Sequence, residues 1–221
     1  MSEIISLNKG EKINLSKGDF INLSKMPAID LAKGGHGLSR VVVGLGWDPA
    51  KRMVEKKGLF GFKRIVEMDA PDIDCDAFAI KLYNGKVKSQ DDLIYYGHRG
   101  SSHDSVYHTG DNLTGDGDGD DEQIIIDLSR VDCDSILLAV CIYQGRSRKQ
   151  HFGMIENAFI RIVDETTNEE LCKFNLDDSY DNYVTVTFGE LVKNNNEWTF
   201  KAIGSASNKE TIGKYAHEYG Y

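Results

Sequence analysis

Proline, long apolar runs and closely spaced cysteines are scarce in this chain of 221 residues. Its three prolines exclude a proline-rich linker protein. The longest uninterrupted apolar run, Ile136–Tyr143, covers eight residues, whereas a helix that crosses a bilayer needs about 20. The first residues also lack an apolar stretch of signal-peptide length. The sequence therefore predicts a cytoplasmic protein without membrane spans.

The cysteines and histidines carry no catalytic or metal-binding signature. Cys75, Cys133, Cys141 and Cys172 form no CxxC pair, so neither a zinc knuckle nor a thioredoxin-type motif is present. No GxSxG or Walker A sequence occurs. His98, His103 and His108 are interpreted as ordinary polar loop residues, because no other ligand pattern accompanies them. We expect reduced, buried thiols and a protein that is not an enzyme.

Negative charge dominates the chain but is unevenly spread. The net charge is -9, and residues 70–221 carry 14 Lys and Arg against 27 Asp and Glu. Residues 1–69 are slightly basic, with 12 cations against 8 carboxylates. Because binding to nucleic-acid phosphates needs clustered cations, this balance disfavours a nucleic-acid partner. It favours cations as ligands.

Short apolar stretches separated by turn residues fill most of the chain. Asn84-Gly85 is the sharpest turn signal between them. No alternation of strands with helices appears, so the pattern predicts an all-β fold, an antiparallel β-sandwich. A short helix is plausible in the polar tail after Gly204. The predicted strands lie at 40–47, 74–82, 92–96, 105–108, 123–128, 136–143, 158–164, 171–175, 183–188 and 197–203.

Two segments stand apart from the predicted sandwich. Four copies of an octad start at Ile5, Ile13, Ile21 and Ile29, each reading apolar, polar, apolar, polar, Lys. We divide the chain into residues 1–28, edge strands or a flexible arm, and a sandwich domain at 29–221. Within that domain, residues 49–68 form a basic insertion, which we interpret as a loop or a short amphipathic helix.

The acidic loop Gly110–Glu122 is the most informative segment. It has six carboxylates, an Asn and four glycines, with no cation. Glycines let the backbone curl so that oxygen atoms converge, and calcium takes six to eight oxygen ligands. An EF-hand is rejected because its third and sixth positions would be Leu113 and Asp116, and a strand follows. A calcium-binding loop at the end of the sandwich fits better.

A second acidic group at the start of a predicted strand can complete the site. Alternation along the strand puts Asp72, Asp74 and Asp76 on one side, where they repel each other without a cation. The predicted cofactor is therefore Ca²⁺. The predicted ligand set is Asp72, Asp74, Asp76, Asp111, Asn112, Asp116, Asp118, Asp120, Asp121 and Glu122.

Several motifs occur along the chain beside the two acidic segments. They are VGLGWD (43–48), DIDCDAF (72–78), HTGDNLTGDGDGDDE (108–122), FGMIENAFIR (152–161), FGEL (188–191) and EWTF (197–200). Together they resemble the TerD family of tellurite-resistance and general-stress proteins over roughly residues 29–204. The resemblance implies a calcium-binding β-sandwich with a non-enzymatic, cytoplasmic role in stress assemblies, often near the membrane. The family usually has a small polar residue where this chain has Asp76, so we expect a third acidic ligand to be available here.

Two basic segments suggest partners. Lys51–Arg64 combines six cations with Leu59, Phe60 and Phe62, so docking on an anionic membrane surface is the alternative to a protein partner. Residues 144–151 form a second basic patch, interpreted as a solvated loop or a docking site. The main hypothesis is a calcium-regulated module that binds protein partners of a stress-resistance assembly.

Overall fold

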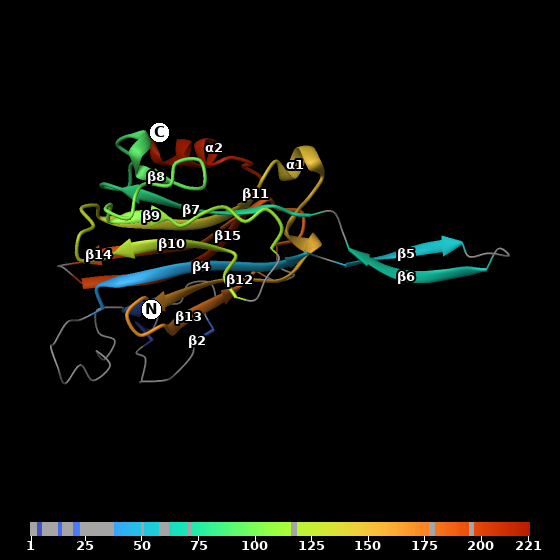
Figure 1. The fold of residues 1–221 in the computed structure, drawn as a ribbon. Helices are drawn as coiled ribbons and strands as arrows, with labels where there is room; N and C mark the ends of the chain where they lie inside the picture. The colour runs from blue at the N-terminus through green and yellow to red at the C-terminus, as the bar shows by residue number, and fades with distance from the viewer. Residues whose placement is uncertain are drawn as a thin grey trace.

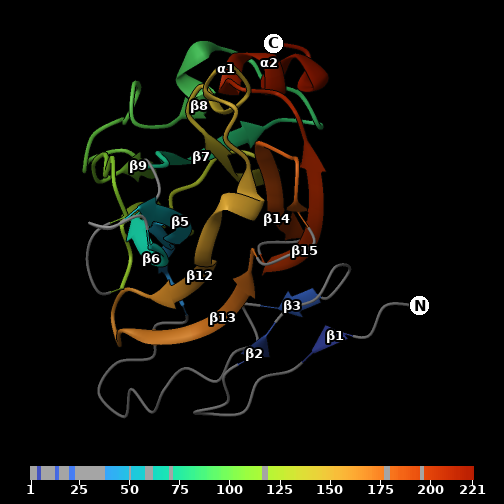
Figure 2. The same cartoon turned by 90° about the vertical axis from the view of Figure 1, so that its right-hand side faces the viewer.

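Two stacked β-sheets form the body of the protein in the computed structural model (Figures 1 and 2). The structure describes residues 4–5, 13–14, 20–22, 38–49, 51–57, 62–69, 72–115, 119–176, 180–194 and 197–221. The central strands of both sheets run antiparallel, which confirms the predicted all-β sandwich. Short strands at the edges add two parallel pairs, β1 with β3 and β2 with β13.

One sheet has seven strands and the other six. The seven-stranded sheet has the order β1 (Ile4–Ile5), β3 (Phe20–Asn22), β15 (Glu197–Ser207), β14 (Thr185–Asn194), β11 (Ser135–Ile142), β7 (Cys75–Leu82) and β8 (Leu93–Ile94). The six-stranded sheet has the order β2 (Ile13–Asn14), β13 (Glu169–Asn175), β12 (Ile155–Asp164), β4 (Arg40–Pro49), β10 (Glu122–Asp127) and β9 (Val106–His108).

The apolar run noted in the sequence becomes β11, which is buried along its whole length. Ile136, Leu138 and Val140 pack between the two sheets, while Leu137 and Ala139 lie on the other face of their sheet. That outer face is covered by the C-terminal segment, where Tyr215 is buried in the same cluster. A strand covered on both faces needs apolar residues at every position, which explains the unbroken run.

The C-terminal segment contains the expected short helix, α2 (Ile212–Ala216), followed by the 3-10 turn η6 (His217–Tyr219). Thr211 begins α2 by accepting a hydrogen bond from the backbone N–H of Lys214. The predicted turn at Asn84-Gly85 is present, with φ of +53° and +73°. Three shorter elements complete the body: η3 (Gln90–Asp92), α1 (Gly145–Arg148) and η4 (Phe152–Met154).

The octad region supplies strands at sheet edges. β3 pairs with β15, β1 pairs with β3, and β2 pairs with β13 of the other sheet. The fourth octad copy lies outside the described residues, and the boundary after residue 28 stays a prediction.

The basic insertion is a two-stranded ribbon, so its interpretation as a loop or short helix was wrong. β5 (Lys51–Lys57) pairs antiparallel with β6 (Lys63–Asp69), from Lys51 opposite Asp69 to Lys57 opposite Lys63. Val54 pairs with Val66 at its centre, and β-branched residues favour strands over helices. The ribbon leaves the sandwich at the end where α1 lies and points away from the body (Figure 1).

Candidate metal centre

Three carboxylates meet at the end of the sandwich from which the ribbon leaves. Asp74 and Asp76 stand at the start of β7, and Asp111 comes from the loop after β9. One oxygen from each of the three lies within 4.8 Å of the others. Asp74 and Asp76 are buried, whereas Asp111 is exposed to solvent. The described residues thus bring together members of both acidic segments predicted to share a cation.

Burial and mutual repulsion make this arrangement costly without a counter-ion. Burial, then Asp111 and Glu122, raises the pKa of Asp74 from 3.8 to about 6, although Arg148 opposes the shift. Burial, then Glu122 and Asp74, raises the pKa of Asp76 to about 9. The Oδ1 atom of Asp74 is buried and has no hydrogen-bond partner. A buried acceptor without a donor is what a cation would satisfy.

Glu122 connects the elements that surround the three-carboxylate cluster. Its Oε2 accepts a hydrogen bond from the backbone N–H of Ala77 at 2.6 Å and lies 3.3 Å from Nε2 of His108. Its Oε1 accepts from the backbone N–H of Asn112 at 3.4 Å. Glu122 therefore ties β10 to β7 and to the acidic loop. Burial raises the pKa of Glu122, and the neighbouring His108 imidazole partly opposes that shift.

His108 is a site residue that the sequence interpretation missed. Its side chain is fully buried against Glu122, on β9, instead of being polar loop surface. A usable signal was present, because alternation along β9 puts His108 on the same side as the buried Val106.

Asn112 and Asp121 shape the loop through their own hydrogen bonds. Asn112 Oδ1 accepts from the backbone N–H groups of Thr114 and Gly115. Its Nδ2 donates to Asp121 Oδ1 at 2.9 Å, and Asp121 Oδ2 accepts from the backbone N–H of Trp47 at 3.0 Å. Both oxygens of Asp121 thus hold the loop against the end of β4.

Asp120 turns away from the three-carboxylate cluster. Its Oδ1 lies 2.7 Å from Nε of Arg161, and Oδ2 accepts from the side-chain amide of Gln123 at 3.1 Å. A Cβ at Gly44 would come within 2.2 Å of the Asp120 carboxylate, so this glycine of β4 makes room for the ion pair. Asp116 and Asp118 lie outside the described residues.

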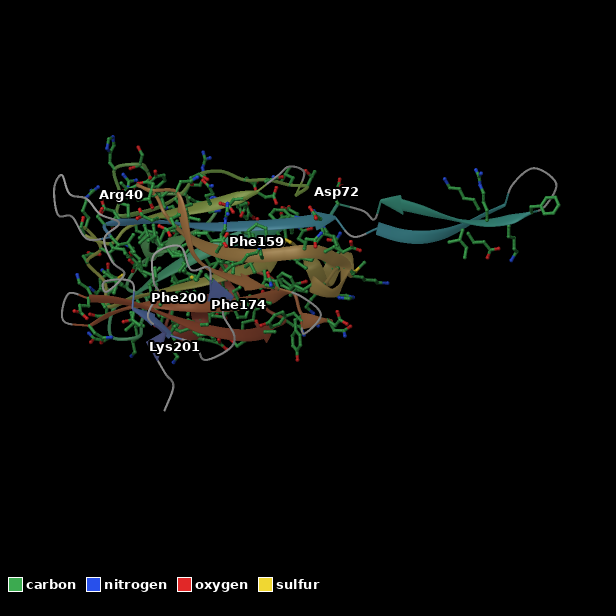
Figure 3. The ribbon with its side chains drawn as sticks, turned by 90° about the horizontal axis from the view of Figure 1, so that it is seen from below. Arg40, Asp72, Phe159, Phe174, Phe200 and Lys201 are labelled. Carbon is green, nitrogen blue, oxygen red and sulfur yellow. The ribbon has the colours of Figure 1, made fainter. Side chains whose placement is uncertain are left out.

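The loop around α1 fixes the start of β7. The backbone N–H of Tyr143 donates to the carbonyl of Asp74 at 2.8 Å, and Gln150 Nε2 donates to the carbonyl of Asp72 at 3.0 Å. The Asp72 side chain is exposed, at the base of the ribbon (Figure 3). The basic segment 144–151 therefore acts on the acidic end through the side chain of Gln150 and through the charge of Arg148, which lowers the pKa of Asp74.

The donor set of Asp74, Asp76 and Asp111 fits a hard cation. All three offer carboxylate oxygen, which calcium and magnesium prefer, and no sulfur or imidazole donor belongs to the group.

Among the described helices, none is long and apolar enough to cross a bilayer.

Comparison with known proteins identifies the family of this chain. A family model described as the TerD domain matches residues 19–219. The stress response protein SCP2 of Bacillus subtilis is 47% identical over 191 residues, which are 86% of this chain and 94% of that protein. The tellurium resistance protein TerD of Serratia marcescens is 38% identical over 177 residues, 79% of this chain and 84% of that protein.

Two solved structures share the fold. A Streptomyces coelicolor homologue of the telluride resistance protein TerD superposes with a TM-score of 0.56 at 19% identity, covering 80% of this chain and 94% of that one. The protein SAV2460 superposes with a TM-score of 0.59 at 23% identity, covering 82% and 96%. The family model and the curated relatives cover most of the sequence. The chain belongs to the TerD family.

Proposed function

We propose that this protein is a calcium-binding, non-catalytic interaction module of a bacterial-type stress or tellurite-resistance system. The observation that carries the proposal is the unpartnered, buried Oδ1 of Asp74 inside a group of three carboxylates. Acidic clusters are common without an ion, but a buried carboxylate oxygen with no donor is rare. A bound cation supplies both the missing partner and the missing charge.

Calcium suits the site better than magnesium. Magnesium demands a near-ideal octahedron and usually keeps several waters, whereas calcium accepts irregular sets of carboxylates and carbonyls. The carboxylates here come from a rigid strand start and from a glycine-rich loop, which gives an irregular set of donors. Asp74, Asp76 and Asp111 would hold the ion. Calcium would there neutralise the repelling charges and fix the loop to β7.

A non-catalytic role fits the state of the thiols. All four cysteines are buried, and burial raises the pKa of Cys133 to about 11 and of Cys172 to about 12. Burial also raises the pKa of Cys75 and Cys141 well above its usual value. The thiolate is the reactive form of cysteine, so such groups are poor reductants of a tellurium oxyanion at neutral pH. A tellurite-reduction assay on the pure protein tests this point.

The role in stress rests on relatives that carry stress-response and tellurium-resistance names. In this proposal calcium orders the acidic end of the sandwich, and a protein partner in the cytoplasm recognises the ordered loops. Neutralising carboxylates that crowd one end changes both the charge and the mobility of that surface.

Titration calorimetry tests calcium binding directly. Calcium should bind the metal-free protein with clear preference over magnesium. Asp76→Asn keeps the side-chain size but removes a ligand charge, so it should weaken calcium binding by roughly tenfold or more. Asp91→Asn is the matched control, because Asp91 has an 84% exposed side chain away from the cluster. Equal calcium affinity in all three proteins would sink the proposed site.

A further inference from the structure

We propose that the β5–β6 ribbon is an exchange arm that binds the body of a second copy of this chain, so that two copies form a twofold dimer. The ribbon forms a sheet of its own, and neither strand pairs with any other strand in the described residues. It extends away from its own body in two perpendicular views (Figures 1 and 3). An isolated two-stranded hairpin is at best marginally stable in water. Docking on another surface would supply the missing packing.

The ribbon exposes the kind of side chains that an interface buries. Phe62 and Ile65 are 77% and 69% exposed, the two highest values among the large apolar residues that the structure describes. The next, Leu113, reaches 58%. Within the described part of the chain, the outer edge of each ribbon strand pairs with no other strand, and natural proteins usually cover or charge such edges. Apolar side chains and open edges together mark an association surface.

Like charges stand opposite each other near the ribbon's tip. The register places Lys56 opposite Arg64 and Lys57 opposite Lys63. Cross-strand pairs of equal charge destabilise a hairpin. One ion pair, Lys63 with Glu55 at 2.7 Å, compensates part of this repulsion. An anionic partner surface would offset the repulsion among the remaining cations.

A second copy of the chain supplies that surface. Residues 51–69 contain six Lys and Arg against three Asp and Glu, a net charge of +3, so the rest of the chain carries -12. Opposite charges draw the ribbon toward the body of another molecule. Two ribbons, by contrast, repel each other at their basic tips, which argues against ribbon-to-ribbon pairing.

In a reciprocal exchange, the ribbon of each copy docks on the body of the other. Identical partners usually form closed twofold dimers, in which each copy gives and receives the same contact. A stable interface takes about 20–30 residues from each side. The two seven-residue strands of the ribbon would supply part of that number, and the body surface that receives the partner's ribbon would supply the rest.

Analytical ultracentrifugation of the full chain tests the proposal. At low salt the wild-type protein should sediment as a dimer that dissociates on dilution, and added salt should weaken it by screening. Lys56→Glu with Arg64→Glu replaces attraction by repulsion, so the dimer dissociation constant should rise by roughly tenfold or more. Phe62→Ser with Ile65→Ser should weaken the dimer without changing its charge. Lys86→Glu with Arg99→Glu is the matched control, because both side chains are exposed on the body.

Circular dichroism and the melting temperature establish that each variant is folded. A wild-type chain that stays monomeric at every concentration would overturn the proposal. So would a dimer that ignores both ribbon variants. Binding of a monomeric wild type to vesicles of anionic phospholipid would assign the ribbon to a membrane surface instead.

Mixing distinguishes ribbon-to-body from ribbon-to-ribbon contact. A chain whose residues 51–69 are replaced by a short Gly-Ser linker keeps the receiving surface but has no arm. It should form a mixed complex with a wild-type chain through the single remaining arm. Failure of that complex, with a wild-type dimer present, would show that the ribbons meet each other and that the proposed contact is wrong.

Discussion

Acidic residues only a few positions apart have different roles in this loop. Asp111 joins the carboxylate cluster, Asp121 holds the backbone of Trp47, and Asp120 pairs with Arg161. The side chain of Asp120 is almost fully buried, and Arg161 also reaches Glu170 at 3.1 Å. Asp120 thus joins the loop to β12 and β13. Its contacts favour a structural role, and its role as a metal ligand stays a prediction.

Replacing Asp120 with Ala should therefore lower the stability of the metal-free protein. The change removes one of the two carboxylate partners of Arg161 and leaves Glu170 as the other. We expect a loss of about 1–3 kcal/mol in the free energy of unfolding. Calcium affinity should fall less than with Asp76→Asn. Urea unfolding in the presence of a chelator measures the first effect, and calorimetry measures the second. Unchanged metal-free stability together with lost calcium binding would restore Asp120 as a ligand.

Composition shows that a loop concentrates carboxylates, but it does not assign a role to each of them. The partners that decide each role lie far along the chain: Arg161 is 41 residues from Asp120, and Trp47 is 74 residues from Asp121. Those distances are closed by the pairing of β10 with β4 and of β4 with β12. The acidic loop could therefore be predicted from the sequence, but the roles of its individual carboxylates could not.

Among the elements, strands with a buried face were predictable and the ribbon was not. β11 and β7 follow the predicted ranges within one residue, because their apolar patterns reflect burial. Among the described residues the ribbon pairs with neither sheet of the body, and its many charges masked the strand-forming residues Val54, Ile65 and Val66. The resemblance to the TerD family is confirmed by the family model that matches residues 19–219.

Removing the ribbon should leave the sandwich intact. Both strands pair only with each other within the described structure, so no sheet of the body loses a neighbour. Replacing residues 51–69 with a short Gly-Ser linker should keep the melting temperature within a few degrees of wild type, about 1 kcal/mol or less in stability. Thermal unfolding and calcium calorimetry check the outcome. A large drop in melting temperature would mean that ribbon side chains belong to the core.

For the whole molecule, the acidic end couples stability to pH. In the folded, metal-free protein the pKa of Asp76 is about 9 and that of Asp74 about 6, both above the ordinary value of 3.8. Between pH 3.8 and about pH 9, the folded state therefore holds more protons than the unfolded chain. Stability that protonation provides is fully present below the unfolded pKa and is lost as pH rises toward the folded pKa. The contribution of Asp74 and Asp76 should accordingly make the metal-free protein melt at a lower temperature near pH 8 than near pH 5.

Calcium should reverse that dependence. The ion binds deprotonated carboxylates, so protons compete with it and its apparent affinity rises with pH. At a hundredfold excess over the dissociation constant, binding adds about 2.7 kcal/mol to the free energy of unfolding. The gain in melting temperature on adding calcium should therefore grow from about pH 5 to about pH 8. Thermal unfolding with calcium and with chelator, across this range, measures both slopes.

Asp76→Asn supplies the control for this coupling. Asparagine does not titrate, so the metal-free variant should lose the part of the pH slope that comes from position 76. Its metal-free stability near pH 8 should equal or exceed that of wild type, because Asp76 must take up a proton on folding at that pH and asparagine need not. A calcium gain that is the same at every pH in wild type would mean that these carboxylates do not bind the ion. Equal slopes in both metal-free proteins would place the coupling elsewhere in the molecule.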